Sequence, residues 1–442
     1  VRTICETPML FRQHSRAMFQ AVKDWENAHK ENYDCAQRGC SALQTALLKS
    51  LLAEIAYHNG EDSLSIFADW MKFFDTIHIP TLIHKLIETE YPLHVANLSL
   101  QQHVSPRVIQ CQGISSLPMQ VDRSIIAGDM QSVAFTRVYL RADMKALVET
   151  HDLFVKITLF VDDTSFFSKK SDRIKLQEDV AKCLIDFHKS ALRLKLKLSP
   201  KSTIVCSNPE LADRLQTELA NLGFVYQVST HARDLGVTFN AAISKPDNLL
   251  KQRLTSSAPR IMSITKIAMV NNRASVLWKG SGFSASTWGH AVCGIPNTQL
   301  AKIEKEALAC AGFNKPGRCR ILGLVLKFGQ LGMPMSRIIK ETTTAWFDVL
   351  NLYMSFFKLD DLRTSWSKAL DHLWDYSNPA NGIRGIRTNV MVMLQSLGWK
   401  PRLWNMWENP RGECFILNQE VPALAVSKLL CYDYIDTCFQ RA

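Results

Sequence analysis

Several features common in proteins are missing from this sequence. No apolar run approaches the ~20 residues that a membrane-spanning helix needs, so we expect no membrane partner. The 12 cysteines form no Cys-x-x-Cys pair and no zinc-knuckle spacing, which excludes the common structural zinc sites. Internal repeats and low-complexity tracts are absent as well. Scattered, unpaired cysteines favour reduced thiols in a cytoplasmic or nuclear protein.

Acidic residues are scarce in one part of the chain. The protein has 442 residues and a net charge of +11, and this length suggests about two or three domains. Residues 241–330 hold thirteen Lys and Arg but only three Asp and Glu. Nearly all of the positive excess therefore lies in this segment. It predicts either a surface that follows a nucleic-acid backbone or a solubilising face.

Apolar periodicity predicts an alternating order of strands and helices. Residues 1–62 are mostly helical, and a strand follows over 64–69. From there to residue 240 helices alternate with strands, which predicts an α+β sheet layer with helices on one side. Short strands and loops are expected over 95–122. From 246 the pattern is helical and basic, and from about 331 to the end it is helical and rich in tryptophan.

The stretch over 153–168 carries two adjacent acids between apolar runs. Alternation predicts two strand faces. One face has Val155, Ile157, Leu159 and Val161, and the other has Phe154, Lys156, Thr158, Phe160 and Asp162. Two carboxylates at the tip of a hairpin are unfavourable unless a cation neutralises them. Asp162 and Asp163 are therefore candidate metal ligands. The alternative is a solvated turn, because Asp is favoured in turns for local hydrogen bonding.

A second acid occupies an equivalent position on another strand. Leu64, Ile66 and Ala68 share one face of the predicted strand, and Asp69 ends it on the opposite face. The same pattern is predicted for Asp162. Two strands that end in acids on their polar faces can converge on one metal site if they are neighbours in the sheet.

The order of these and other motifs resembles the reverse transcriptase domain of non-LTR (LINE-type) retrotransposons, over roughly residues 1–330. Several motifs in the right order are far more specific than any one of them. The matching segments are Gln37-Arg38-Gly39, Phe67 to Ile77 around Asp69, Ala127-Gly128-Asp129-Met130-Gln131-Ser132, Phe160-Val161-Asp162-Asp163, Pro200-Lys201-Ser202 and Leu235-Gly236.

The resemblance implies a right-hand polymerase fold of the α+β class, with an antiparallel palm sheet backed by helices. It implies partial fingers over 1–62 and a palm over 63–240 that contains a fingers insertion at about 78–122. A basic helical thumb would occupy 241–330. Residues 331–442 match no motif, and we expect a helical region there without assigning its role.

The implied activity is that of an RNA-directed DNA polymerase. Its partners would be an RNA template, a DNA primer or target and dNTPs, and nuclear action is implied. Two Mg²⁺ ions, or Mn²⁺, would support nucleotidyl transfer to a primer 3′-hydroxyl. Asp69 and Asp162 would be the bridging ligands, with Asp163 as a weaker, supporting acid.

Other residues receive roles from the same resemblance. Phe74 would be the steric gate that favours deoxynucleotides, or else a core aromatic. Lys201 would lie near the leaving pyrophosphate, or else be a solvated loop lysine. Gly128 and Ser132 would lie under the template–primer and contribute to substrate binding. The expected nucleic-acid contacts are Arg38, Leu235, Gly236, Lys251, Arg253 and Arg260.

Two alternatives stay open. Ala127 and Val133 depart from the family pattern, where glutamine and proline are usual at these positions. These departures favour a decayed relative that binds nucleic acid without polymerising. The other alternative is an unrelated α+β protein with a solvated Asp-Asp turn and a basic partner-binding region. No endonuclease or RNase H motif is visible in the sequence.

Overall fold

The computed structural model describes residues 7–121, 123–246, 248–313, 319–418 and 421–440, and it is a mixed α+β structure. Cys5 and two basic residues of the 241–330 segment, Lys315 and Arg318, lie outside these ranges. Within them no cysteine forms a disulfide. In the same ranges no helix has both the length and the apolar character needed to cross a membrane.

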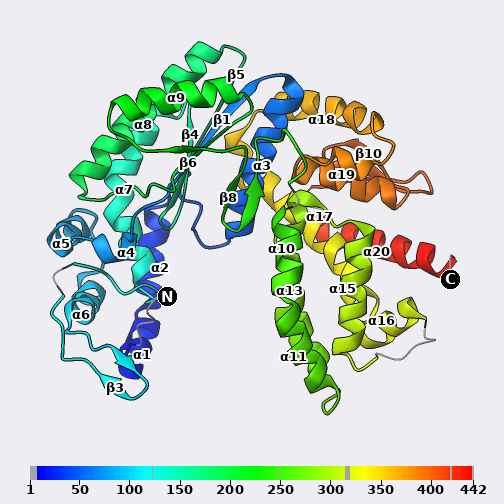
Figure 1. Cartoon of the computed structure of the whole chain (residues 1–442), viewed down its shortest axis with the longest axis horizontal. Helices are drawn as coiled ribbons and strands as arrows, with labels where there is room; N and C mark the ends of the chain where they lie inside the picture. Colours follow the sequence, from blue (N-terminus) through cyan, green and yellow to red (C-terminus); the bar gives the residue numbers. More distant parts are fainter. Residues whose placement is uncertain (1–6, 122, 247, 314–318, 419–420, 441–442) are drawn as a thin grey trace.

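A five-stranded sheet lies between the helical regions (Figure 1). Its strands, in the order in which they pair, are β4 (Lys156–Phe160), β5 (Asp163–Lys170), β1 (Asp62–Ala68), β6 (Thr203–Cys206) and β7 (Gln227–Val228). Strands β6 and β7 run parallel, and the other pairs are antiparallel. The sheet is therefore mixed, whereas an antiparallel sheet was predicted.

Helices cover both faces of this sheet. One face, with Leu64 and Ile66, packs against α7 (Ser132–His151), α8 (Arg173–Arg193) and α9 (Pro209–Asn221). The other face, with Phe167 and Val205, packs against α3 (Ala42–Asn59). The prediction of helices on one side was wrong, because the central strands carry buried apolar residues on both faces.

Helix α3 is buried on almost all sides. Its first turn is closed by a capping box, in which Ser41 and Gln44 satisfy each other's backbone N–H groups. Gly60 ends the helix in the left-handed region, with φ of 74°. Two charged side chains, Lys49 and Glu54, are buried within this mostly apolar helix.

A helical arm lies at the left of Figure 1. Its segments come before β1 and between β1 and β4 in the sequence. It consists of α1 (Met9–Ala17), α2 (Phe19–Ala28), α4 (Phe73–Thr76), α5 (Ile79–Glu88), α6 (Leu93–Val104) and a hairpin of β2 (Gln110–Cys111) and β3 (Ile114–Ser115). Helix α6 contradicts the strands and loops predicted from residue 95. Its end is fixed by tertiary structure, since the buried His103 accepts a hydrogen bond from Ile126 N at 3.0 Å.

A second helical arm follows the sheet, at the right of Figure 1. The hairpin of β8 (Ala232–Asp234) and β9 (Val237–Phe239) leads into it. The arm consists of α10 (Asn248–Ser256), α11 (Ala258–Ala268), α12 (Ala274–Leu277), a π-helical turn (Trp278–Gly282), α13 (Phe283–Thr287), α14 (His290–Cys293), α15 (Asn297–Cys310) and α16 (Arg320–Phe328).

The C-terminal region packs directly on α3. Its main helices are α17 (Pro334–Leu352), α18 (Leu359–Trp374), α19 (Ile386–Ser396) and α20 (Ala423–Gln440), and 3₁₀ turns cover Gln330–Gly332, Met354–Phe356 and Pro379–Gly382. Glu54 of α3 accepts hydrogen bonds from the N–H groups of Arg387 and Thr388, at 2.9 and 3.0 Å. One helix thus caps the N-terminus of another across the interface.

The same region contains a small sheet that the sequence did not predict. Its three antiparallel strands are β10 (Lys400–Leu403), β11 (Met406–Glu408) and β12 (Cys414–Ile416). Trp407 on the middle strand is fully buried. These strands are too short for a clear alternation pattern, so tertiary packing decides their conformation.

Candidate active site

Two carboxylates lie opposite each other at one end of the central sheet. The register of β1 and β5 pairs Ala68 with Thr164. Asp69 directly follows β1, and Asp163 is the first residue of β5. The antiparallel register therefore brings Asp69 opposite Asp163, with both side chains on one face.

Asp162 occupies a different position. Phe160 pairs with Asp163, so Val161 and Asp162 form a two-residue turn between β4 and β5. Val161 has a φ of 60°, which interrupts the alternation predicted to continue through Asp162. Asp162 is half-buried in this turn. Its role as a bridging metal ligand stays a prediction, and Asp163 is the acid that faces Asp69.

The loop after α8 fixes the backbone of Asp69. Ser199 N donates to Asp69 O at 2.7 Å, and Asp69 N donates to Ser202 Oγ at 3.1 Å. Lys201 lies in this loop, and its side chain is exposed. The short Pro-Lys-Ser segment thus holds the end of β1 and brings a lysine to the same site.

A cavity of about 340 Å³ lies over this end of the sheet. Strands β1, β5, β6 and β8, helix α3 and the 199–202 loop contribute to its walls. Four predicted residues and two that were not predicted are among its lining residues: Asp69, Asp163, Lys201, Leu235, Lys49 and Asp234.

The cavity lining carries three acids, Asp69, Asp163 and Asp234, and three bases, Lys49, Lys201 and Arg233. Desolvation by the surrounding protein, followed by the charge of Asp162, raises the pKa of Asp163 to about 6. The charges of Asp234 and Asp69 act in the same direction, whereas that of Lys49 opposes them. Asp163 as a whole residue is exposed, so solvent screens part of this effect. A cation at the site would relieve the repulsion.

A buried ion pair forms part of the cavity wall. Lys49 Nζ lies 2.7 Å from Asp234 Oδ1, and the two side chains are 6% and 5% exposed. Lys49 also lies over the ring of Phe67, 5.6 Å from its centroid. Neither member was predicted. The only sequence signal is a single lysine in the otherwise apolar stretch of α3, and it does not identify a partner.

Comparison with known proteins gives no assignment. No protein-family model matches this chain, and no curated protein is similar enough to match it. The chemistry and geometry of the cavity residues are therefore the basis for assigning a function.

The donor set at the sheet end fits a hard divalent cation. Among the described residues, no three or more His, Cys, Asp or Glu side chains are grouped to hold a metal ion. Mg²⁺ needs fewer protein ligands, because it keeps waters and binds substrate phosphates alongside one or two carboxylates. Asp69 and Asp163 supply two such carboxylates. The two Mg²⁺ ions, or Mn²⁺, stay a prediction.

Several predicted substrate-binding residues lie outside the cavity lining. Phe74 is half-buried and packs against Phe73, with ring centroids 5.6 Å apart. Ser132 is fully buried, and its hydroxyl donates to Ile126 O at 2.5 Å. Gly128 forms a turn with φ of 90°. In this structure their roles are in packing and local conformation, and their contacts with substrate stay predictions.

The Leu235-Gly236 turn connects β8 to β9 next to the cavity. Both residues have positive φ, 45° and 80°. The guanidinium of Arg253 donates to the carbonyls of Gly236 and Trp288. Arg253 therefore ties the second helical arm to this turn, and these donors are engaged within the protein rather than directed at nucleic acid.

The other predicted nucleic-acid contacts are exposed side chains. Lys251 lies on α10 and Arg260 on α11, in the basic arm. Arg38 is exposed and lies 5.7 Å from the ring centroid of Phe19. Exposure leaves all three accessible to a phosphate backbone, but none of them lines the cavity.

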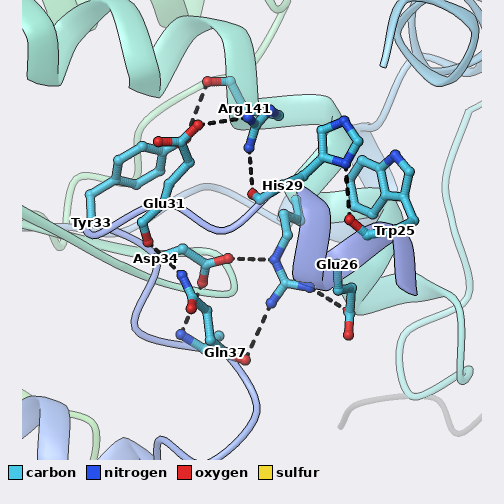
Figure 2. Close-up of polar contacts among 10 residues, drawn as sticks. Trp25, Glu26, His29, Glu31, Tyr33, Asp34, Gln37 and Arg141 are labelled. Carbon is cyan, nitrogen blue, oxygen red and sulfur yellow. Dashed lines mark hydrogen bonds and ion pairs between the residues drawn. The ribbon is translucent and has the colours of Figure 1, made fainter. Parts of the chain in front are cut away.

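A polar network joins the segment before α3 to helix α7, as Figure 2 illustrates. Arg137 of α7 pairs with both Glu26 and Asp34. One turn later, Arg141 pairs with Glu31 at 2.6 Å. The same segment also forms an isolated parallel bridge with β4. The first helical arm is thereby attached to the strand that leads into the Asp162-Asp163 turn.

Proposed function

We propose that this protein is an RNA-directed DNA polymerase of the non-LTR retrotransposon type, which adds deoxynucleotides to a primer 3′-hydroxyl. The observation that carries the proposal is the register of β1 and β5. It brings Asp69 opposite Asp163, beside Lys201, on one cavity. The alternative of an unrelated protein with a solvated turn predicts that Asp69 and Asp162 lie far apart.

The arrangement of the helical arms is compatible with a right-hand polymerase. They extend from the sheet on opposite sides of it (Figure 1). In this proposal the first arm is the fingers, the sheet with its helices is the palm, and the basic arm over 241–330 is the thumb. Its exposed Lys251 and Arg260 would hold phosphates of the primer–template without recognising base sequence.

Three of the cavity residues would have a role in this reaction. Asp69 and Asp163 would hold divalent ions, which when bound stabilise the charge on the attacking and leaving oxygens. Lys201 would offset charge on the leaving pyrophosphate. The fixed backbone of Asp69 keeps its carboxylate aligned with that of Asp163, which limits the reorganisation needed when substrate binds.

Primer extension tests the proposal. The assay uses an RNA template, a DNA primer, dNTPs and Mg²⁺, and compares wild type with Asp163→Asn and Asp69→Asn. We expect extension to fall by at least about a hundredfold in each variant, since each removes one electrostatic stabiliser of the transition state. Asp213→Asn, which changes an exposed acid on α9, is the matched control and keeps wild-type activity.

A catalytically decayed relative is the second candidate. The internal hydrogen bond of Ser132 and the packing of Phe74 outside the cavity favour it. It predicts that wild type binds an RNA–DNA hybrid but extends no primer with either Mg²⁺ or Mn²⁺. Extension that is equal in wild type, Asp163→Asn and Asp69→Asn would contradict the polymerase proposal and point to a contaminating polymerase.

A further inference from the structure

The Lys49–Asp234 pair has an unusual position for an ion pair. Both side chains are at least nine-tenths buried, yet both line the cavity that also contains Asp69 and Asp163. Only one carboxylate oxygen of Asp234 is engaged. Among the described residues, the other oxygen, Oδ2, has no hydrogen-bond partner, which leaves an unsatisfied buried acceptor in the cavity wall.

Stability alone does not account for this pair. Burying two charges carries a desolvation penalty that their attraction often fails to repay. Apolar residues of similar volume would fill the space between α3 and β8 at least as well. An unsatisfied carboxylate oxygen adds a further penalty. The pair therefore points to an electrostatic role in the cavity.

Its charges act on the carboxylates of the sheet end. The charges of Lys49 and Asp234 influence Asp163 in opposite directions. While both are present, each opposes the effect of the other, and the charge of Lys49 has the larger effect. Removal of one member would leave a full unit charge, of either sign, in the low-dielectric wall beside Asp163, where its effect is larger than in water.

We propose that the Lys49–Asp234 pair sets the divalent-cation affinity of the Asp69–Asp163 site. Asp234 holds the ammonium of Lys49 against β8 and so keeps it from neutralising the carboxylates. Lys49 in turn prevents Asp234 from acting as an additional carboxylate ligand. Both are positioning residues. The inference rests on the metal-dependent function proposed for this site, but it does not depend on polymerisation.

The two single substitutions then have opposite effects. Asp234→Asn keeps the shape of the side chain and an acceptor for Lys49. It leaves a net positive charge on the pair, so the affinity of the site for cations falls. Lys49→Met keeps most of the volume but leaves an unpaired carboxylate, so cation affinity rises. We expect changes of at least about tenfold in each direction, because a unit charge in the cavity wall acts on a divalent cation. The double variant Lys49→Met/Asp234→Asn returns close to wild type.

Direct Mn²⁺ binding tests the inference without turnover. The full chain is titrated with Mn²⁺ in the absence of nucleotide, and free Mn²⁺ is followed by electron paramagnetic resonance. Mn²⁺ binding that is lost in Asp163→Asn belongs to the Asp69–Asp163 site. Thermal unfolding establishes that each variant is folded, and the double variant supplies a second comparison if a single variant unfolds.

The outcomes separate this inference from the proposed function. Opposite shifts in the two single variants support it, since mere structural damage would weaken binding in both. Unchanged affinity, or weaker binding in both, overturns it while the metal site itself stands. Opposite shifts without primer extension would overturn the polymerase proposal alone. If wild type shows no Mn²⁺ binding that depends on Asp163, both ideas fail.

Discussion

A single buried histidine illustrates how surroundings determine the chemistry of a residue. His58 of α3 lies in the interface with α19, and its Nδ1 is 2.6 Å from a guanidinium nitrogen of Arg387. Burial, and then the positive charge of Arg387, lowers the pKa of His58 to about 3. The neutral ring is therefore the form compatible with the folded state.

This pKa shift predicts acid sensitivity. The unfolded chain takes up a proton at His58 near pH 6.5, whereas the folded chain does so only near pH 3, so stability falls as the pH drops through this range. Between pH 7 and pH 5, His58 should account for a loss of about 2 kcal/mol in the free energy of unfolding. Urea unfolding of wild type and His58→Gln at both pH values measures it.

The difference in the pH dependence of stability between wild type and His58→Gln isolates the contribution of His58, because the other buried histidines are common to both proteins. His58→Gln should start less stable at pH 7 and lose less on acidification. Parallel pH dependences in wild type and variant would show that His58 is not held neutral.

At the scale of elements, the attachment of the first helical arm to the sheet is the most informative feature. Cys35 N donates to Leu159 O, and Leu159 N donates to Tyr33 O, both at 2.8 Å. The segment before α3 therefore extends the sheet beyond β4. Arg137 of α7 holds the same segment through Glu26 and Asp34.

Loss of Arg137 should strongly destabilise this attachment. Arg137→Met leaves two acids, one of them buried, without their cation, and we expect a loss of about 3 kcal/mol in the free energy of unfolding. Chemical denaturation measures this loss. Arg137→Met combined with Asp34→Asn and Glu26→Gln is the matched control and should recover part of it. Equal stability of the single and triple variants would mean that the charges contribute little.

For the whole molecule, α3 is the common element of the sheet and the C-terminal region. It packs on the sheet through one side, and α17, α18 and α19 pack on its other sides. Trp346 and Trp366 are fully buried in the cluster that these helices share with α3. The apolar cluster therefore crosses the boundary predicted at residue 330, and the C-terminal region completes the core beneath the candidate site.

A chain that ends at residue 329 should fail to form a cooperative structure, since it exposes the apolar face of α3 to water. We expect binding of the dye ANS and the loss of a sharp thermal transition, as in a molten globule. A chain that ends at residue 440 is the control and should melt like the full protein. A sharp transition in the shorter chain would instead make the C-terminal region an independent domain.

The sequence by itself determined the local structure. The alternation of helices and strands predicted up to residue 240 is present, and α8 and α9 are two of its helices. The hairpin turn at Asp162 and the acid after β1 were also predicted, whereas Asp163 belongs to β5 and not to the turn. These features depend on neighbouring residues, whose spacing encodes helix, strand or turn.

Only the tertiary structure decided which residues meet. Lys49 and Asp234 are 185 positions apart, and no local pattern links them. The choice of Asp163 rather than Asp162 as the acid opposite Asp69 follows from strand register and from the positive φ of Val161. The second covered face of the sheet likewise depends on α3 and the C-terminal helices. Strand neighbours and buried charge pairs arise from contacts between distant segments, and apolar periodicity carries no information about which segments those are.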